Sequence, residues 1–136
     1  MPIWWTRSDR RVFDVLSVGH FTIDTIHLPD RKNPFVVLGG SAAYVSLAAR
    51  RLGARVAVLS KVGCDFPEAY KWWLDQEGID QSNVIKNDDA RTTRFELEYN
   101  ADLSERTLRS ECRALPITIQ DLSHVPKAEL VHIGPV

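Results

Sequence analysis

A double glycine joins a short apolar strand to a helix of small residues, and this junction constrains the fold more than any other feature. The sequence reads VVLGGSAAYVSLAARRLGARVAVLSKV over residues 36–62. Apolar residues recur in it at spacings of three and four, at Val45, Ala48, Ala49 and Leu52. This spacing predicts a helix over residues 41–52, with Ser41 as the N-cap and Gly53 as the stop. The β-branched run over residues 55–62 predicts a strand after it.

Other strands and helices alternate around this segment. Apolar runs predict a first strand at residues 13–18 and a last, buried strand at residues 129–133. Asp65 and Glu68 have the spacing of a capping box and predict the start of a second helix, which ends at Gly78. The acidic set at the end of this helix and beyond it is interpreted as a solvated face: Asp75, Glu77, Asp80, Asn87, Asp88 and Asp89. The alternation predicts an α/β layered fold with a largely parallel sheet.

Two further strand pairs do not fit that sheet, because their residues alternate between apolar and polar. One pair spans about residues 20–38 and the other about residues 92–112. Such strands have one dry face and one wet face, whereas the strands of a parallel sheet are covered on both faces. We therefore predict a small separate β-flap.

The composition excludes two classes of partner. The chain has 136 residues and a formal net charge of -1, so no excess of positive charge favours nucleic acid or an anionic membrane. Its apolar runs are far shorter than the roughly 20 residues that span a bilayer. Residues 1–11 are interpreted as an N-terminal extension without the apolar segment of a signal peptide. We predict a cytoplasmic protein that binds a small molecule.

Two features of the sequence point to a binding site. Gly39 and Gly40 precede a helix, where free backbone N–H groups and the positive end of the helix dipole can bind an oxygen-rich ligand. Asp24 is the one carboxylate of the first strand pair and is suited to accept hydrogen bonds from vicinal hydroxyls. Each also has a plainer interpretation, a tight turn for the glycines and a solvated side chain for Asp24. Neither GxGxxG nor GxxxxGK[ST] is present.

The ordered set of motifs resembles the N-terminal part of the ribokinase or PfkB family of carbohydrate and nucleoside kinases. The motifs are VLSVGHFTIDTIHL, GGSAAYVSLAARRLGARVAVLSKVGCD, GID, RTTRFELEYN, ITIQDL and AELVHIGPV. Together they cover residues 12–136. The resemblance implies an α/β sandwich with a β-flap lid over the sugar, ATP as phosphoryl donor, Mg²⁺, and dimerisation through the lids.

The resemblance also implies roles for single residues. Asp24 corresponds to the aspartate that binds sugar hydroxyls, and Gly39 and Gly40 to the pair that closes round the sugar. Phe95 and Leu97 correspond to lid residues over the substrate. Two further positions differ from the family pattern. Thr22 stands where some members have an asparagine, and Tyr44 replaces an asparagine in the first turn of the helix, so a polyol, an inositol or a nucleoside is as open a substrate as ribose.

The family's glycine-rich anion hole and catalytic aspartate belong to a C-terminal half that these residues do not match. A parallel strand such as the last one also requires a covering helix, and only three residues follow it here. We therefore expect the substrate-binding and lid portion of a kinase, with no catalytic residue in this chain and no activity on its own. The alternative is a non-catalytic module that binds a polyol or dimerises through its flap.

Overall fold

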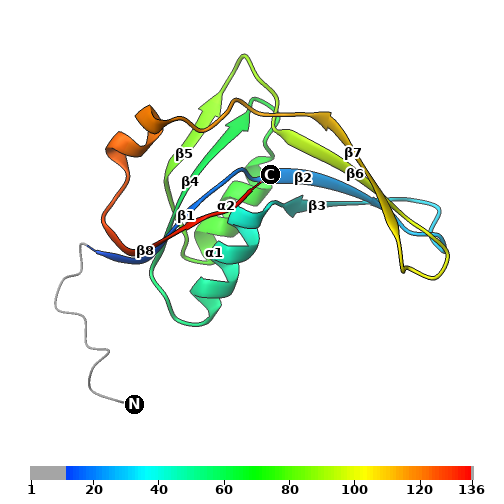
Figure 1. Cartoon of the computed structure of the whole chain (residues 1–136), viewed down its shortest axis with the longest axis horizontal. Coiled ribbons are helices and arrows are strands. Elements are labelled where there is room, and N and C mark those ends of the chain that lie inside the picture. Colours follow the sequence, from blue (N-terminus) through cyan, green and yellow to red (C-terminus); the bar gives the residue numbers. More distant parts are fainter. Residues whose placement is uncertain (1–11, 136) are drawn as a thin grey trace.

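The computed structural model describes residues 12–135, so the expected extension over residues 1–11 lies outside the described part. Figure 1 shows two sheets joined end to end, with two helices packed against one of them. The strands are β1 (Phe13–Val18), β2 (Thr22–His27), β3 (Phe35–Gly39), β4 (Val56–Gly63), β5 (Asp80–Asn87), β6 (Thr93–Tyr99), β7 (Arg106–Cys112) and β8 (Ala128–Ile133). The helices are α1 (Ser41–Arg51), α2 (Glu68–Gln76) and the 3-10 helix η2 (Ile119–His124).

The first sheet, which we call the main sheet, has the strand order β5-β4-β1-β8, and all its strands are parallel. Its central strand β4 is buried on both faces, which explains its nearly continuous run of apolar residues. The predicted parallel sheet and its α/β class are confirmed.

Different elements cover the two faces of the main sheet. On one face, Val58 of β4 packs with Ala42 of α1 and Leu74 of α2. On the other face, Leu16 and Leu59 are covered by the connector, the segment of residues 113–127 between β7 and β8. Neither α1 nor α2 is long and apolar enough to cross a membrane.

The two edges of the main sheet differ from the sequence prediction. β8 forms the predicted strand, but the prediction that it is buried is wrong: Leu130 and Val131 are each 54% exposed and Ile133 is 76% exposed. The reason is its edge position, since no element within residues 12–135 covers its outer part. At the other edge lies β5, a strand that was not predicted because only Val84 and Ile85 are apolar in it.

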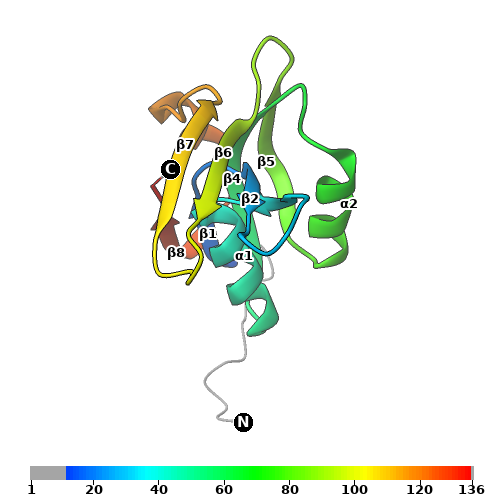
Figure 2. The ribbon, with the colours of Figure 1, turned by 90° about the vertical axis from the view of Figure 1, so that its right-hand side faces the viewer.

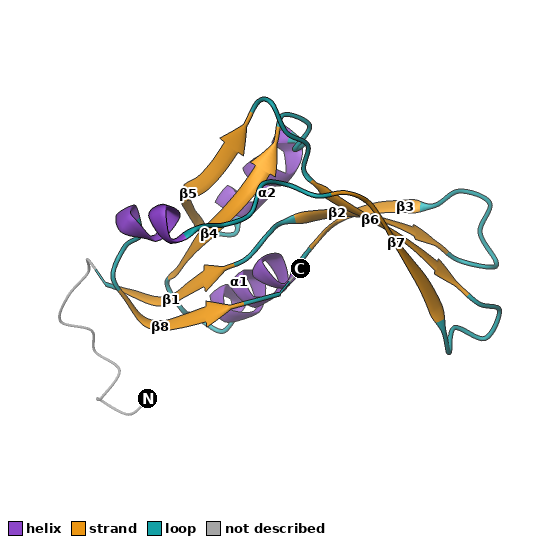
Figure 3. Ribbon diagram, turned by 45° about the horizontal axis from the view of Figure 1, so that its top comes forward, coloured by secondary structure: helices purple, strands orange, loops and turns teal. Residues whose placement is uncertain are grey.

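The second sheet, which we call the flap, has the strand order β3-β2-β6-β7. Figure 3 shows it extending away from the main sheet as a long twisted ribbon. Each predicted strand pair forms an antiparallel hairpin, and β2 and β6 join the two hairpins in parallel. The predicted separate flap is confirmed.

Both predicted helix N-caps are wrong, whereas Gly53 follows the C-cap of α1 as the predicted stop. The N-cap of α1 is Gly40, with no side-chain cap hydrogen bond, and Ser41 Oγ instead donates to the carbonyl of Pro135 at 3.0 Å. The N-cap of α2 is Pro67, and the Asp65 carboxylate instead accepts from the backbone N–H of Thr92 at 2.7 Å. In both cases a partner distant in the sequence takes the side chain that local spacing assigned to a helix end.

Substitution of two leucines should affect stability very differently, because only one of them is in the core. Leu74 is fully buried between α2 and the main sheet, whereas Leu52, just after α1, is 90% exposed. We expect Leu74→Ala to lower the free energy of unfolding by about 2–5 kcal/mol, because it leaves a cavity. Leu52→Ala should change it by less than about 0.5 kcal/mol. Urea unfolding of both variants measures this, and equal losses would contradict the placement of α2.

Candidate functional site

The candidate site lies where the flap meets the main sheet. β1 leads through Gly19 and His20 into β2, and β3 leads through Gly40 into α1. Figure 2 views the molecule from the end of the flap, where β2, β6 and β7 lie side by side. The carboxyl end of a main-sheet strand, a helix N-terminus and one face of the flap therefore adjoin at the root of the flap.

Asp24 is the central side chain of this region. It is half-buried in β2, and Thr22 Oγ1 donates a hydrogen bond to its Oδ1 at 2.7 Å. Partial burial raises the pKa of Asp24 above its usual value, against the opposing effects of the Thr22 hydrogen bond and the positive charge of Arg106. The fold thus holds a carboxylate where its charged form is disfavoured, which is a common property of functional acids.

Gly39 makes room for this carboxylate. It lies opposite Thr22 in the antiparallel β2–β3 pair, and Asp24 lies two residues further along β2. A Cβ atom on Gly39 would overlap the Asp24 Oδ2 and lie 2.7 Å from Thr22 Oγ1. Gly39 is thus required by side-chain packing.

Gly40 is required by the backbone. Its φ angle of 93° is in the region that favours glycine. A Cβ atom here would also overlap the carbonyl oxygen of His20. This close approach lets the chain turn from the flap into α1. Packing against Asp24 therefore requires glycine at position 39, and backbone geometry requires it at position 40.

Phe95 and Leu97 lie on the same face of the flap as Asp24. In the parallel β2–β6 pair, Phe95 is the register partner of Asp24, and Leu97 is the partner of Ile26. Leu97 is buried, while Phe95 is only partly buried and so remains accessible beside the carboxylate. We call this side, defined by Thr22, Asp24, Phe95 and Leu97, the Asp24 face.

Tyr44 stands apart from this cluster. It is in the first turn of α1, and 61% of its surface is exposed. The structure therefore brings Thr22, Asp24, Gly39 and Phe95 together, and it places Gly40 and Tyr44 at the adjoining helix N-terminus.

No pattern in the sequence points to Arg106. It is the first residue of β7 and pairs with Tyr99 of β6, whose hydroxyl accepts a hydrogen bond from Arg106 Nη1 at 3.3 Å. Its charge reaches Asp24 because β2, β6 and β7 are neighbours in the flap. Only the strand order reveals this, since residues 24 and 106 are far apart in the chain.

Within residues 12–135, no group of three or more His, Cys, Asp or Glu side chains is arranged to hold a metal ion. The Asp24 face offers a single carboxylate, with a hydroxyl and an aromatic ring beside it. This set suits an uncharged ligand rich in hydroxyl groups better than a divalent cation.

Comparison with known proteins gives a family match over almost the whole chain. Residues 12–134 match the pfkB family carbohydrate kinase. A cytidine kinase of Thermococcus kodakarensis is 27% identical over 130 residues, which are 92% of this chain and 44% of that protein. The chain therefore spans less than half the length of this relative.

Solved structures show the same fold. A pyrophosphate-dependent kinase in the ribokinase family is 24% identical with a TM-score of 0.74, over 89% of this chain and 41% of that one. An uncharacterized sugar kinase of Pyrococcus horikoshii in complex with ATP is 24% identical with a TM-score of 0.66, over 79% of this chain and 37% of that one. At this identity the likeness supports the fold alone.

The contacts of Asp24 predict how its pKa responds to substitution. Thr22→Val removes a hydrogen bond that favours the charged form, so we expect the pKa of Asp24 to rise further. Thr25→Val, on the opposite face of the same strand, should leave it unchanged. Titration of the Asp24 carboxyl carbon by NMR measures both. A pKa that is the same in Thr22→Val and the parent chain would show that the hydrogen bond is unimportant.

Proposed function

Since the chain belongs to the pfkB family of carbohydrate kinases, we propose that it forms the substrate-binding and lid portion of an ATP-dependent kinase. The acceptor is a sugar, a polyol or a nucleoside, and one of its hydroxyls receives the γ-phosphate of ATP. The cytidine kinase relative supports the acceptor class, and membership of a carbohydrate kinase family supports ATP as the donor. ATP as a substrate also favours the cytoplasm.

The Asp24 face is the observation that carries this proposal. One oxygen of the carboxylate is held by Thr22, and the other lies over Gly39, where no side chain intervenes. A carboxylate oriented in this way can accept hydrogen bonds from two neighbouring hydroxyls of a ligand, and its charge strengthens them. Vicinal hydroxyls are shared by sugars, polyols and the ribose of nucleosides, so one site serves all three classes.

The other residues shape the space around the ligand. Phe95 is the register partner of Asp24 and supplies an apolar surface beside the carboxylate, against which a sugar ring or a base packs. The turn at Gly40 brings the first N–H groups of α1 beside the Asp24 face, where they can donate hydrogen bonds to the ligand. Tyr44, in the first turn of α1, reduces the room there and adds one hydroxyl, so we assign it to substrate selection.

We propose that the phosphoryl transfer step takes place in a protein with the full length of the relatives. Phosphoryl transfer requires a group that orients the attacking hydroxyl and positive charge or N–H donors at the phosphates. We assign these groups, and the site for Mg²⁺, to the portion of the relatives that this chain does not match. This chain then contributes acceptor binding and the exclusion of water by the flap.

Asp24→Asn separates binding from stability. Because the pKa of Asp24 is raised in the folded chain, stability falls as pH rises through that pKa, and ionised Asp24 costs stability at pH 7. We therefore expect Asp24→Asn to be as stable as the parent chain or more so. Its affinity for cytidine or myo-inositol should fall at least about tenfold, because charge-assisted hydrogen bonds are weakened.

Asp102→Asn is the matched control, since Asp102 is exposed in the turn between β6 and β7. This variant should bind both compounds as the parent chain does. Isothermal titration calorimetry gives the affinities, and thermal unfolding gives the stabilities. An unchanged affinity in Asp24→Asn would remove Asp24 from the site.

A second role, self-association through the flap, is favoured by its two edges. The edge strands β3 and β7 expose Val36 and Leu108. Open strand edges with exposed apolar side chains favour pairing with another chain. We propose that two copies meet through their flaps, either in the kinase or as a non-catalytic polyol-binding or dimerisation module.

Leu108→Glu tests this association. A charge at the exposed edge of the flap should convert a dimer to a monomer, as measured by light scattering on a sizing column. Ile119→Glu, at an exposed position of the connector, should leave the dimer intact. A parent chain that is monomeric at all concentrations would exclude the flap interface.

A further inference from the structure

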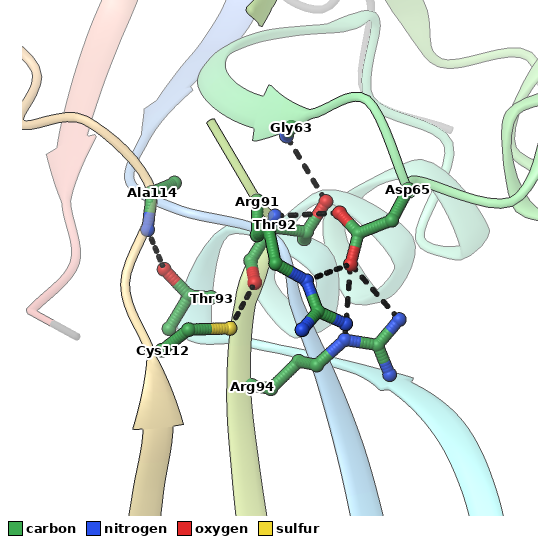
Figure 4. A network of polar contacts seen from close by, with 8 residues as sticks. All are labelled: Gly63, Asp65, Arg91, Thr92, Thr93, Arg94, Cys112 and Ala114. Carbon is green, nitrogen blue, oxygen red and sulfur yellow. Dashed lines mark hydrogen bonds and ion pairs between the residues drawn. The ribbon is translucent and has the colours of Figure 1, made fainter. Parts of the chain in front are cut away.

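One polar network joins the two sheets and includes none of the residues of the Asp24 face. At its centre is Asp65, in the turn between β4 of the main sheet and α2. Figure 4 shows the carboxylate facing the start of β6, with Arg91, Thr92 and Arg94 around it. Thr92 N–H donates to Oδ1 at 2.7 Å, Arg94 donates to Oδ2 from Nε at 3.1 Å, and Arg94 Nη2 lies 3.0 Å from the same oxygen.

The Asp65–Arg94 pair is sheltered from solvent. The two side chains are 20% and 23% exposed, whereas Arg91, which reaches the same carboxylate at 3.4 Å, is 63% exposed. A sheltered pair with two donors from one guanidinium is less screened than an exposed single contact. Thr92 and Arg94 are therefore the partners that matter, and we call Asp65, Thr92 and Arg94 the clamp.

The backbone around the clamp is also closely packed. Gly63, the last residue of β4, donates its N–H to Thr92 Oγ1 at 3.0 Å, and Cys64 donates its N–H to the carbonyl of Ala90 at 2.9 Å. A Cβ atom on Gly63 would overlap the backbone of Ala90 and Arg91. The chain entering the flap thus lies directly against the end of β4, and Thr92 is fully buried there.

The same β4–α2 segment also reaches the other hairpin of the flap. Phe66, next to Asp65, stacks on Phe21 at the start of the flap with ring centroids 5.9 Å apart. Tyr70 of α2 donates from its hydroxyl to the carbonyl of Val36 in β3 at 3.3 Å. The β4–α2 segment therefore contacts both hairpins of the flap, one at β6 and the other at β3.

The clamp is charged at all ordinary pH values. Partial burial opposes the ionisation of Asp65, but the hydrogen bonds from Thr92 and Arg94, with the charge of Arg94, outweigh it and lower the pKa of Asp65 to about 2. The stabilising contribution is present above the usual aspartate pKa and is lost as pH falls through about 2. The clamp is permanent under physiological conditions and does not act as a pH switch.

The clamp holds β6 immediately before a residue of the candidate site. Arg94 is the register partner of Ile23, and the next residue, Phe95, is the partner of Asp24. Because side chains alternate along a strand, Arg94 leaves the flap on the side opposite to the Asp24 face. Asp65 can thus fix the position of Phe95 without touching the ligand.

We propose that Asp65 is a positioning residue which, through Arg94 and Thr92, fixes the flap on the main sheet in the orientation that substrate binding requires. The inference rests on the proposed function for the ligand, but the mechanical link between the sheets stands on the contacts alone. Without the clamp, the flap keeps its own strand pairing and loses its orientation relative to the main sheet.

Asp65→Asn and Arg94→Gln test the clamp, with Glu77→Gln as the matched control. Glu77 pairs with Arg51 at 3.1 Å between the ends of α2 and α1, away from the flap. Hydrogen exchange measured by mass spectrometry reports the flap strands and the main-sheet strands separately. Calorimetry with cytidine and myo-inositol reports binding.

We expect Asp65→Asn to accelerate exchange at the start of β6 about tenfold and to weaken binding by a similar factor, with β1 and β4 unchanged. The double variant should be no worse than the poorer single variant, since both remove the same link. Glu77→Gln should match the parent chain in both measurements.

Two results would overturn the inference. Exchange in β6 that stays at the parental rate would show that Asp65 does not hold the flap. Exchange that rises equally in β1, β4 and β6 would show a residue that only stabilises the fold. If the parent chain binds neither compound, the proposed function fails, and the exchange rates alone decide whether the clamp exists.

Discussion

The half-buried carboxylate of Asp24 determines which residues can lie beside it at the root of the flap. Burial disfavours its charged form and raises its pKa, and Thr22 compensates only in part. The space that the carboxylate occupies excludes any side chain at Gly39, so the end of β3 must be glycine. Gly40 then has to turn the chain at once into α1, in a backbone conformation that favours a second glycine. The double glycine is thus explained by one charge and one turn.

A flap that carries such a group is useful only if it is held in place. The flap and the main sheet share no strand, so their relative orientation depends on the segments that run between them. The Asp65 clamp and the close approach of Gly63 to Ala90 and Arg91 supply this link at β6. The end of β4, a buried strand of the main sheet, therefore also anchors the flap.

Elements with strong local patterns could be predicted from the sequence, and features that depend on distant partners could not. The helical spacing around Val45 and the alternation around Phe95 identified α1 and β6 correctly, and the contrast between the two patterns separated the flap from the main sheet. β5 was missed because an edge strand needs few apolar residues. Ser41 and Asp65 have the residue types and spacing of helix caps, but tertiary contacts to Pro135 and Thr92 take their side chains instead.

The candidate site shows the same division. Asp24 and the glycine pair were identifiable as polar or small residues in otherwise apolar surroundings, and the structure adds their contact with each other and with Thr22. Arg106 gave no signal, because its proximity to Asp24 follows only from the order of the flap strands.

A crystal structure of the chain with cytidine or myo-inositol tests the central claim most directly. We expect two neighbouring hydroxyls of the ligand within about 2.7 Å of the Asp24 carboxylate oxygens, with the ligand against Phe95. A ligand bound elsewhere, with Asp24 in contact only with water, would contradict the assignment of this face as the substrate site.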